Sequence, residues 1–250
     1  LITITAGCHE TNVGSQKAFT KAGYTISGKI KSYWKSNMDD NKRVSQILFE
    51  YTKQEDIVFP LHGGITLIGG GSLMNKIAKF WIKICPVLVI VARRHFNHEE
   101  SKELREAGCE YEEVDNINDN LEIQKKIKDY SRCCICFGPA WIFSEKIINL
   151  FESRIVNFNG IPLPKYLGGA HYTWQILNGS REGGLFIQQI TMNIDRGPII
   201  ASESFELPYH IKLPIDYEEY NISKGYEFLK KFIQGVNEGE RFQLRKEEVE

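Results

Sequence analysis

The sequence predicts an α/β fold with a mainly parallel sheet. From Ile65 onward, short apolar runs typical of buried strands alternate with amphipathic helical segments, and glycines mark the turns between them. Strands that alternate with helices in this way form parallel sheets through right-handed crossovers, and ligands then bind at the carboxyl ends of the strands. The 250 residues, of which 42% are hydrophobic, are enough for one or two domains.

The expected elements of this domain follow one another at regular intervals. Each strand is a short run rich in Val, Ile or Cys, and each helix carries apolar residues at helical spacing. The predicted strands are Ile65–Ile68, Val87–Ala92, Cys133–Phe137, one that runs through Val156 and Asn157, and Gly184–Thr191. The predicted helices are one through Leu73 and Trp81, then Glu99–Ala107, Asn120–Tyr130, Ala170–Leu177 and Ser223–Val236.

The first 62 residues have a different pattern. Leu1–Gly7 and Tyr24–Trp34 alternate as strands, with a helix predicted between them from Thr11 to the Ala22-Gly23 stop. The charged stretch Ser36–Asp56 carries apolar residues at helical spacing, so we expect a connecting helix there. The predicted organisation is a strand–helix–strand segment at 1–36, a linker helix at 37–62, an α/β domain at 63–205 and a C-terminal extension with a helix at 206–250.

Charge and composition exclude several classes of partner. The formal net charge is −1, so the chain has no broad electrostatic attraction for nucleic acid. The longest apolar stretch, Trp81–Ala92, is interrupted by Lys83 and Pro86 and is too short for a membrane span, and no secretory leader opens the chain. The six cysteines lack zinc-ligand spacing, which favours no metal site, free thiols and a cytoplasmic setting. We therefore expect neither nucleic acid nor a membrane as a partner.

The glycine run Gly69-Gly70-Gly71 leaves three interpretations open. It has the first two glycines of a dinucleotide-binding turn, but Met74 stands where the third belongs. Arg93 and Arg94 follow the second strand, where an NAD site has an acidic residue, so an NADP-dependent reductase is one alternative. Contact with another anion near Gly71, or a plain strand-to-helix turn, are the others.

Motifs between Phe137 and Ile200 point to specific chemistry. Asn157 is followed by Leu163-Pro164-Lys165-Tyr166 with Gly168, and then by Ile194-Asp195-Arg196-Gly197. In this order and spacing they resemble the catalytic domain of the folate-dependent formyltransferases that act on methionyl-tRNA, glycinamide ribonucleotide or amino sugars. The resemblance covers roughly Ile65–Phe205 and implies a Rossmann-like formyltransferase domain. It also implies transfer of a formyl group from 10-formyltetrahydrofolate to a primary amine.

The resemblance assigns roles that fit this chemistry. Attack of an amine on the formyl carbon develops an oxyanion, which an amide donor such as Asn157 stabilises. A carboxylate such as Asp195 positions the base or a water and tunes its pKa. The catalytic candidates are Asn157, Asn159 and Asp195. The folate-binding candidates are Gly138, Pro139, Trp141, Ile142, Asn193 and Ile194, and the substrate-binding candidates are Lys165, Tyr166, Gly168 and His171.

Asn159 is a departure from the family pattern, which has His at this position. Asn cannot titrate near neutral pH, and loss of a positioned general acid–base typically lowers the rate by ~10²–10⁴-fold. The alternative to an active formyltransferase is therefore a degenerate folate-binding protein without turnover. His171, at the start of a predicted helix, is a candidate to replace the missing base.

Residues 1–36 carry a second resemblance. Asn12-Val13-Gly14-Ser15 and Phe19-Thr20-Lys21-Ala22-Gly23-Tyr24 resemble the C-terminal end of GNAT-type N-acetyltransferases. The acetyl-CoA pyrophosphate loop of that family is absent, so we expect an acetyltransferase remnant without activity, and the start at Leu1 fits a chain cut inside such a domain. Both families acylate amines, which makes a nucleotide-linked amino sugar the expected acceptor. No tRNA-binding domain is predicted after residue 205, which argues against a tRNA substrate.

Overall fold

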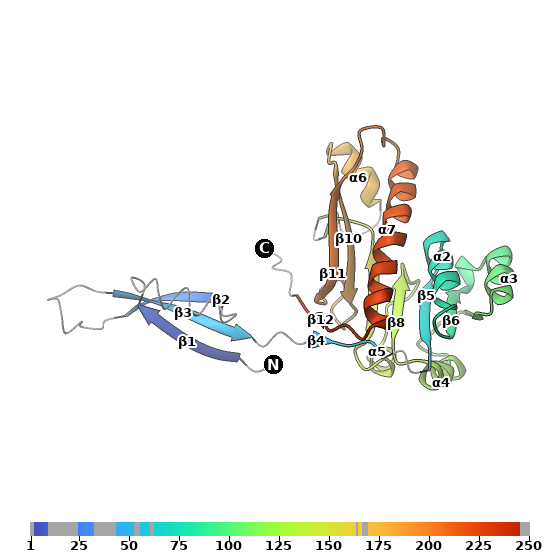
Figure 1. Ribbon diagram of the computed structural model, residues 1–250, viewed down its shortest axis with the longest axis horizontal. Helices are drawn as coiled ribbons and strands as arrows, with labels where there is room; N and C mark the ends of the chain where they lie inside the picture. The colour runs from blue at the N-terminus through green and yellow to red at the C-terminus, as the bar shows by residue number, and fades with distance from the viewer. Residues whose placement is uncertain are drawn as a thin grey trace. The chain divides into compact units, whose positions relative to one another are not determined.

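Contacts divide the computed structural model into two units, Leu1–Glu55 and Asp56–Glu250 (Figure 1). The structure describes residues 3–9, 25–32, 44–52, 56–60, 63–163, 165–166 and 170–245. The described part of the first unit is a three-stranded antiparallel sheet of order β1-β3-β2. Its strands are β1 (Thr3–His9), β2 (Thr25–Ser32) and β3 (Val44–Thr52).

The linker helix predicted at 37–62 is wrong, because β3 occupies the middle of that range. The prediction counted apolar residues at helical spacing, but Ile47, Phe49 and Tyr51 also recur at every second residue, which is the period of a strand. β-branched and aromatic residues favour strands, and β3 pairs with a partner on each side. The helix predicted between Thr11 and Gly23 lies outside the described residues.

The second unit contains a seven-stranded sheet of order β11-β10-β9-β8-β5-β6-β7. The sheet is parallel from β9 to β7, whereas β10 and β11 run antiparallel to their neighbours. The predicted α/β class with a mainly parallel sheet is therefore confirmed. The strands are β5 (Ile65–Gly69), β6 (Val87–Ala92), β7 (Glu110–Val114), β8 (Cys134–Phe137), β9 (Ile155–Asn159), β10 (Glu182–Gln189) and β11 (Ile199–Glu206).

Helices cover both faces of this sheet, which explains why β5, β6 and β8 are buried along their whole length. One core cluster joins α2 and α7 to one face, and a second joins α4 and α5 to the other. The helices are α2 (Ser72–Trp81), η1 (Arg93–His95), α3 (His98–Glu106), α4 (Leu121–Tyr130), α5 (Glu145–Leu150), α6 (His171–Leu177) and α7 (Pro214–Asn237).

Helix α7 begins nine residues earlier than the predicted start at Ser223, and it forms part of the core. Phe228, Leu229 and Ile233 are buried in the cluster that faces the sheet. Asp216 marks the true start, because its carboxylate accepts hydrogen bonds from the backbone N–H groups of Lys212 and Leu213, at 3.0 and 2.9 Å. Pro214 at the first helical position and Asp216 in the first turn were thus helix-start signals upstream of the predicted helix.

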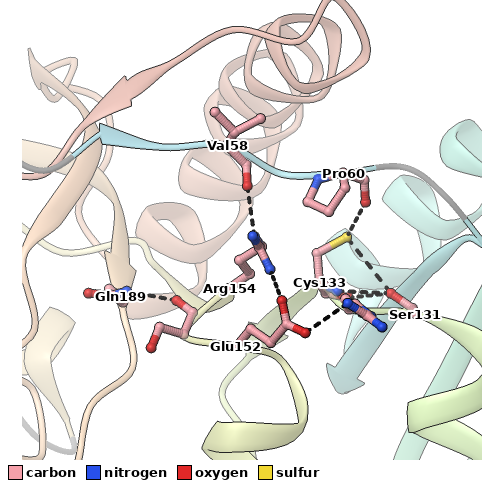
Figure 2. A network of polar contacts seen from close by, with 9 residues as sticks. Val58, Pro60, Ser131, Cys133, Glu152, Arg154 and Gln189 are labelled. Carbon is pink, nitrogen blue, oxygen red and sulfur yellow. Dashed lines mark hydrogen bonds and ion pairs between the residues drawn. The ribbon is translucent and has the colours of Figure 1, made fainter.

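Polar contacts fix the segment Asp56–Pro60 to the amino-terminal edge of the sheet (Figure 2). Arg154 Nε donates to the carbonyl of Val58 at 3.0 Å, and the Cys133 thiol donates to the carbonyl of Pro60 at 3.4 Å. The short strand β4 (Asp56–Ile57) pairs with β12 (Phe242–Gln243), which follows α7. Both ends of the described second unit are therefore held against the same core.

The five cysteines of the second unit are free thiols on or near buried strands: Cys85, Cys109, Cys133, Cys134 and Cys136. Burial raises the pKa of the Cys133 thiol to about 11, so it stays protonated near neutral pH. No helix in the described part of the chain is long and apolar enough to cross a membrane.

Candidate functional site

Asn157 lies near the carboxyl end of β9, the strand that pairs with β8 on one side and with β10 on the other. In the ladder it stands opposite Cys136 of β8 on one side and Gln188 of β10 on the other. Its Nδ2 atom donates to Oδ1 of Asn159 at 2.9 Å, and both side chains are half-buried. Residues two apart on a strand point to the same face, so β9 itself places the two amides side by side.

The amide oxygen of Asn157 is buried and has no hydrogen-bond partner among the residues that the structure describes. An unsatisfied buried acceptor costs about 1–3 kcal/mol until a water or a ligand supplies a donor. Rotation of both amides keeps the hydrogen bond between Asn157 and Asn159 and puts Nδ2 of Asn157 in place of the unsatisfied oxygen. The pair can therefore present either an acceptor or a donor at the same point.

Asp195 lies in the loop between β10 and β11, with its side chain exposed. Its φ of 53° is in the left-handed region, which Asp adopts more readily than most residues. Gln188 Nε2 donates to the carbonyl of Asp195 at 3.2 Å and to that of Gly197 at 2.9 Å. Because Gln188 is also the cross-strand partner of Asn157, this residue connects the two predicted catalytic segments through its strand pairing and its side chain.

The loop Gly138–Phe143, which follows β8, is held by three hydrogen bonds of two side chains. Asn118 Nδ2 donates to the carbonyl of Ile142 at 3.0 Å, and Asn118 Oδ1 accepts from the backbone N–H of Ser144 at 2.8 Å. Trp141 Nε1 donates to a backbone carbonyl at 2.9 Å. These contacts give the loop one conformation before any ligand binds.

Two predicted folate-binding loops begin on the same face of the sheet, because Trp141 of one and Ile190 of the other pack against the same core cluster. Each loop presents exposed aliphatic side chains: Ile142 is 74% exposed and Ile194 is 61% exposed. Exposed aliphatic groups beside fixed main-chain amides suit a flat heterocycle, which packs by its faces and hydrogen-bonds by its edges. The residues present therefore fit the pterin of the formyl donor. The other predicted contacts are Gly138 and Asn193, which are exposed, and Pro139, which is half-buried.

The predicted substrate-binding residues are spread over the loop before α6. Lys165 forms an ion pair with Glu182 at the start of β10, at 2.8 Å, and this hydrogen bond raises the pKa of the lysine. Tyr166 adopts a φ of 60°. His171 begins α6, and its ring lies 4.1 Å from the ring of Tyr172. Gly168 lies outside the described residues, and all four roles stay predictions.

The glycine run is explained by a tight turn between β5 and α2. Gly69 has a φ of 136°, and a Cβ there would clash with the carbonyl oxygen of Phe137. Arg93 forms ion pairs with Glu113 and Asp115 at 2.9 and 3.1 Å, and Arg94 donates to a carbonyl of the neighbouring loop. Both arginines therefore already contact protein groups, which leaves the NADP interpretation without support from these contacts.

Residues 87–210 match the family model described as "Formyl transferase". This part of the chain belongs to the formyl transferase family. The methionyl-tRNA formyltransferase of Finegoldia magna is 26% identical over 151 residues, which is 60% of this chain and 47% of that protein. That of Mycoplasma genitalium is 32% identical over 81 residues, which is 32% of this chain and 25% of that protein. The chain thus spans about half or less of the length of these curated relatives.

Solved structures share the fold of the formyl transferase domain at low sequence identity. Glycinamide ribonucleotide transformylase 1 from Symbiobacterium toebii has a TM-score of 0.59 and 15% identity, over 78% of this chain and all of that one. The N-formyltransferase from Helicobacter canadensis, in complex with folinic acid and dTDP-3-aminofucose, has a TM-score of 0.57 and 18% identity. It is covered over 68% of its length, and this chain over 74%. These likenesses confirm the predicted fold class.

The sequence prediction missed two residues that organise the formyl transferase site. Gln188 is 3% exposed and directly follows the buried apolar residues Leu185, Phe186 and Ile187, so a polar residue at the end of a buried run was the available signal. Asn118 lies in the polar turn before α4 and meets the Gly138–Phe143 loop only through the fold. No local pattern identifies a contact between segments so far apart in the chain.

Proposed function

We propose that the domain transfers a formyl group from 10-formyltetrahydrofolate to a primary amine. The observation that carries the proposal is the arrangement of Asn157, Asn159 and the Asp195 loop around Gln188, within a domain of the formyl transferase family. The amide pair supplies a donor for a developing oxyanion, and the exposed carboxylate of Asp195 supplies an acceptor for a proton.

Each of the candidate residues has a separate role in the proposed reaction. When bound between the Gly138–Phe143 loop and the loop after β10, the folate supplies an activated formyl group. Asn157 stabilises the carbonyl oxygen as the amine forms the new C–N bond. Asp195, through a bridging water, takes the proton that the amine loses, and the folate nitrogen takes a proton as its bond to the formyl carbon breaks. Asn159 fixes the orientation of Asn157.

The proposal also specifies the class of amine that accepts the formyl group. We infer a primary amine on a nucleotide-linked amino sugar, and two observations support this choice. Residues 1–36 resemble another class of amine-acylating enzyme, and the net charge of −1 gives no broad attraction for a tRNA. Methionyl-tRNA and glycinamide ribonucleotide, the substrates named for relatives and fold neighbours, are the competing acceptors.

One observation favours a second function. Asn159 cannot exchange a proton near neutral pH, and it is the residue hydrogen-bonded to Asn157. A domain that binds the folate without turnover would fit this arrangement. The two functions separate in one experiment, which incubates the protein with 10-formyltetrahydrofolate and each amine and follows release of tetrahydrofolate. Formylated amine supports the transferase, and saturable folate binding without product supports the binding protein.

A further inference from the structure

We infer that Gln188 is the positioning residue that sets Asp195 against Asn157, an assignment that rests on the proposed transfer reaction. Its side chain is 3% exposed, although a buried amide is costly unless its hydrogen-bonding groups are satisfied. Both hydrogen atoms of Nε2 are used, one toward the carbonyl of Asp195 and one toward that of Gly197. The amide thus holds the loop on either side of Arg196.

The backbone around Gln188 directs this side chain into the loop. The β10–β11 pairing shifts register between Ile187 and Gln188, which marks an irregularity of the kind that re-aims a side chain next to a functional site. On the opposite side of β10, Gln188 remains in register with Asn157 of β9. The hydrogen bonds of Gln188 therefore restrain the main chain of Asp195 relative to the strand that carries Asn157.

The remainder of the loop is fixed by other groups, so Gln188 acts on Asp195 selectively. Thr191 Oγ1 donates to the carbonyl of Asn193 at 3.1 Å and accepts from its N–H at 3.3 Å. Gly197 is buried, and a side chain there would clash with the carbonyl oxygen of Gln189. Loss of the Gln188 amide should therefore disturb Asp195 more than Asn193 and Ile194, which are predicted to contact the donor.

The neighbouring glutamine provides a matched control. Gln189 follows on the same strand, and its Nε2 donates to the carbonyl of Ser153 at 2.7 Å, in the turn before β9 (Figure 2). The two substitutions Gln188→Met and Gln189→Met remove the same chemical group from adjacent positions. Only the first removes a contact with the Asp195 loop.

The test measures kcat and the KM for 10-formyltetrahydrofolate in both variants, together with hydrogen exchange of the amides of residues 193–197. We expect Gln188→Met to lower kcat by about tenfold or more, with the donor KM within about threefold, because misplacement of a reacting group slows the chemical step. Exchange in the loop should accelerate in Gln188→Met only. Equal kcat values, or equal exchange, in the two variants would overturn the assignment.

Two further measurements distinguish a failure of the Gln188 assignment from a failure of the proposed transfer reaction. If the wild-type protein transfers no formyl group to any acceptor, the proposed function fails, and the exchange measurement alone decides whether Gln188 positions the loop. If Gln188→Met does not fold, Gln188→Glu replaces it, since a carboxylate of similar size accepts hydrogen bonds but donates none at neutral pH. This variant should show the same loss of kcat, and wild-type kcat in Gln188→Glu would overturn the assignment.

Discussion

The side-chain amide of Asn157 donates to that of Asn159 at 2.9 Å, so the residue that replaces the family histidine is bound to the predicted oxyanion donor. Asn159 therefore retains one function of a histidine at this position, which is to orient Asn157. It lacks the other, which is to move a proton. We therefore expect Asn159 to limit the reaction rate rather than the binding of the donor.

Restoring a titratable group should accelerate transfer. We expect Asn159→His to raise kcat by about a hundredfold or more, because an imidazole can take the amine proton near neutral pH. The measurement is the steady-state rate of formyl transfer, with the exposed Asn149→His as control. An unchanged rate in Asn159→His would show that proton transfer does not limit the reaction.

Removal of the oxyanion donor should have the opposite effect. We expect Asn157→Ala to lower kcat by ~10²–10³-fold, the effect typical of one lost donor in such a site, with a smaller change in the KM for the folate. Asn149→Ala, on an exposed surface of α5, is the control. A loss confined to the KM would assign Asn157 to binding instead.

Asn118 should control donor binding rather than the chemical step. Asn118→Ala removes the hydrogen bonds that hold the Gly138–Phe143 loop, so we expect the KM for 10-formyltetrahydrofolate to rise by about tenfold, because the loop must then be ordered on binding. Asn97→Ala, which removes the cap of α3, tests for a general loss of stability. The same KM in both variants would contradict a role for this loop.

The turn after β5 predicts that alanine at Gly69 lowers the free energy of unfolding far more than alanine at Gly70. Gly69→Ala should lower the free energy of unfolding by about 1–3 kcal/mol from backbone strain, and by more from the clash with Phe137. Gly70→Ala places its Cβ 3.9 Å from the Cβ of His95, an ordinary van der Waals contact, and should change this free energy little. Urea unfolding of the two variants provides the comparison, and equal stabilities would contradict the described turn.

Asp216 predicts a pH dependence of stability. Two backbone N–H groups at the start of α7 hold the pKa of its carboxyl below the usual value. Its stabilising effect is therefore present above the unfolded-state pKa and is lost as the pH falls through the lower folded-state pKa. The Tm of Asp216→Ala should lie below that of the wild type at pH 7, and the two should converge on acidification. A constant difference, or the same behaviour in the exposed Glu219→Ala, would contradict this.

Local patterns predicted most elements of the α/β unit, because its central strands are continuous apolar runs and its helices carry clear periodicity. They failed for β3, whose apolar residues fit both a helical and a strand period. Only pairing with β1 and β2 decides between helix and strand there. The predicted catalytic residues Asn157 and Asn159 lie together because they share a strand. Their link to Asp195 depends on Gln188, a contact that only the folded sheet creates.

Every role proposed above requires that the two loops after β8 and β10 bind a formylated folate. Calorimetric titration with folinic acid, a stable folate ligand, tests it without reference to turnover or acceptor. We predict saturable binding of one ligand per chain, weakened by Asn118→Ala and by Ile194→Asp but unchanged in Asn159→His. Absence of saturable binding by the wild-type protein, or equal affinity in the loop variants, would contradict the account.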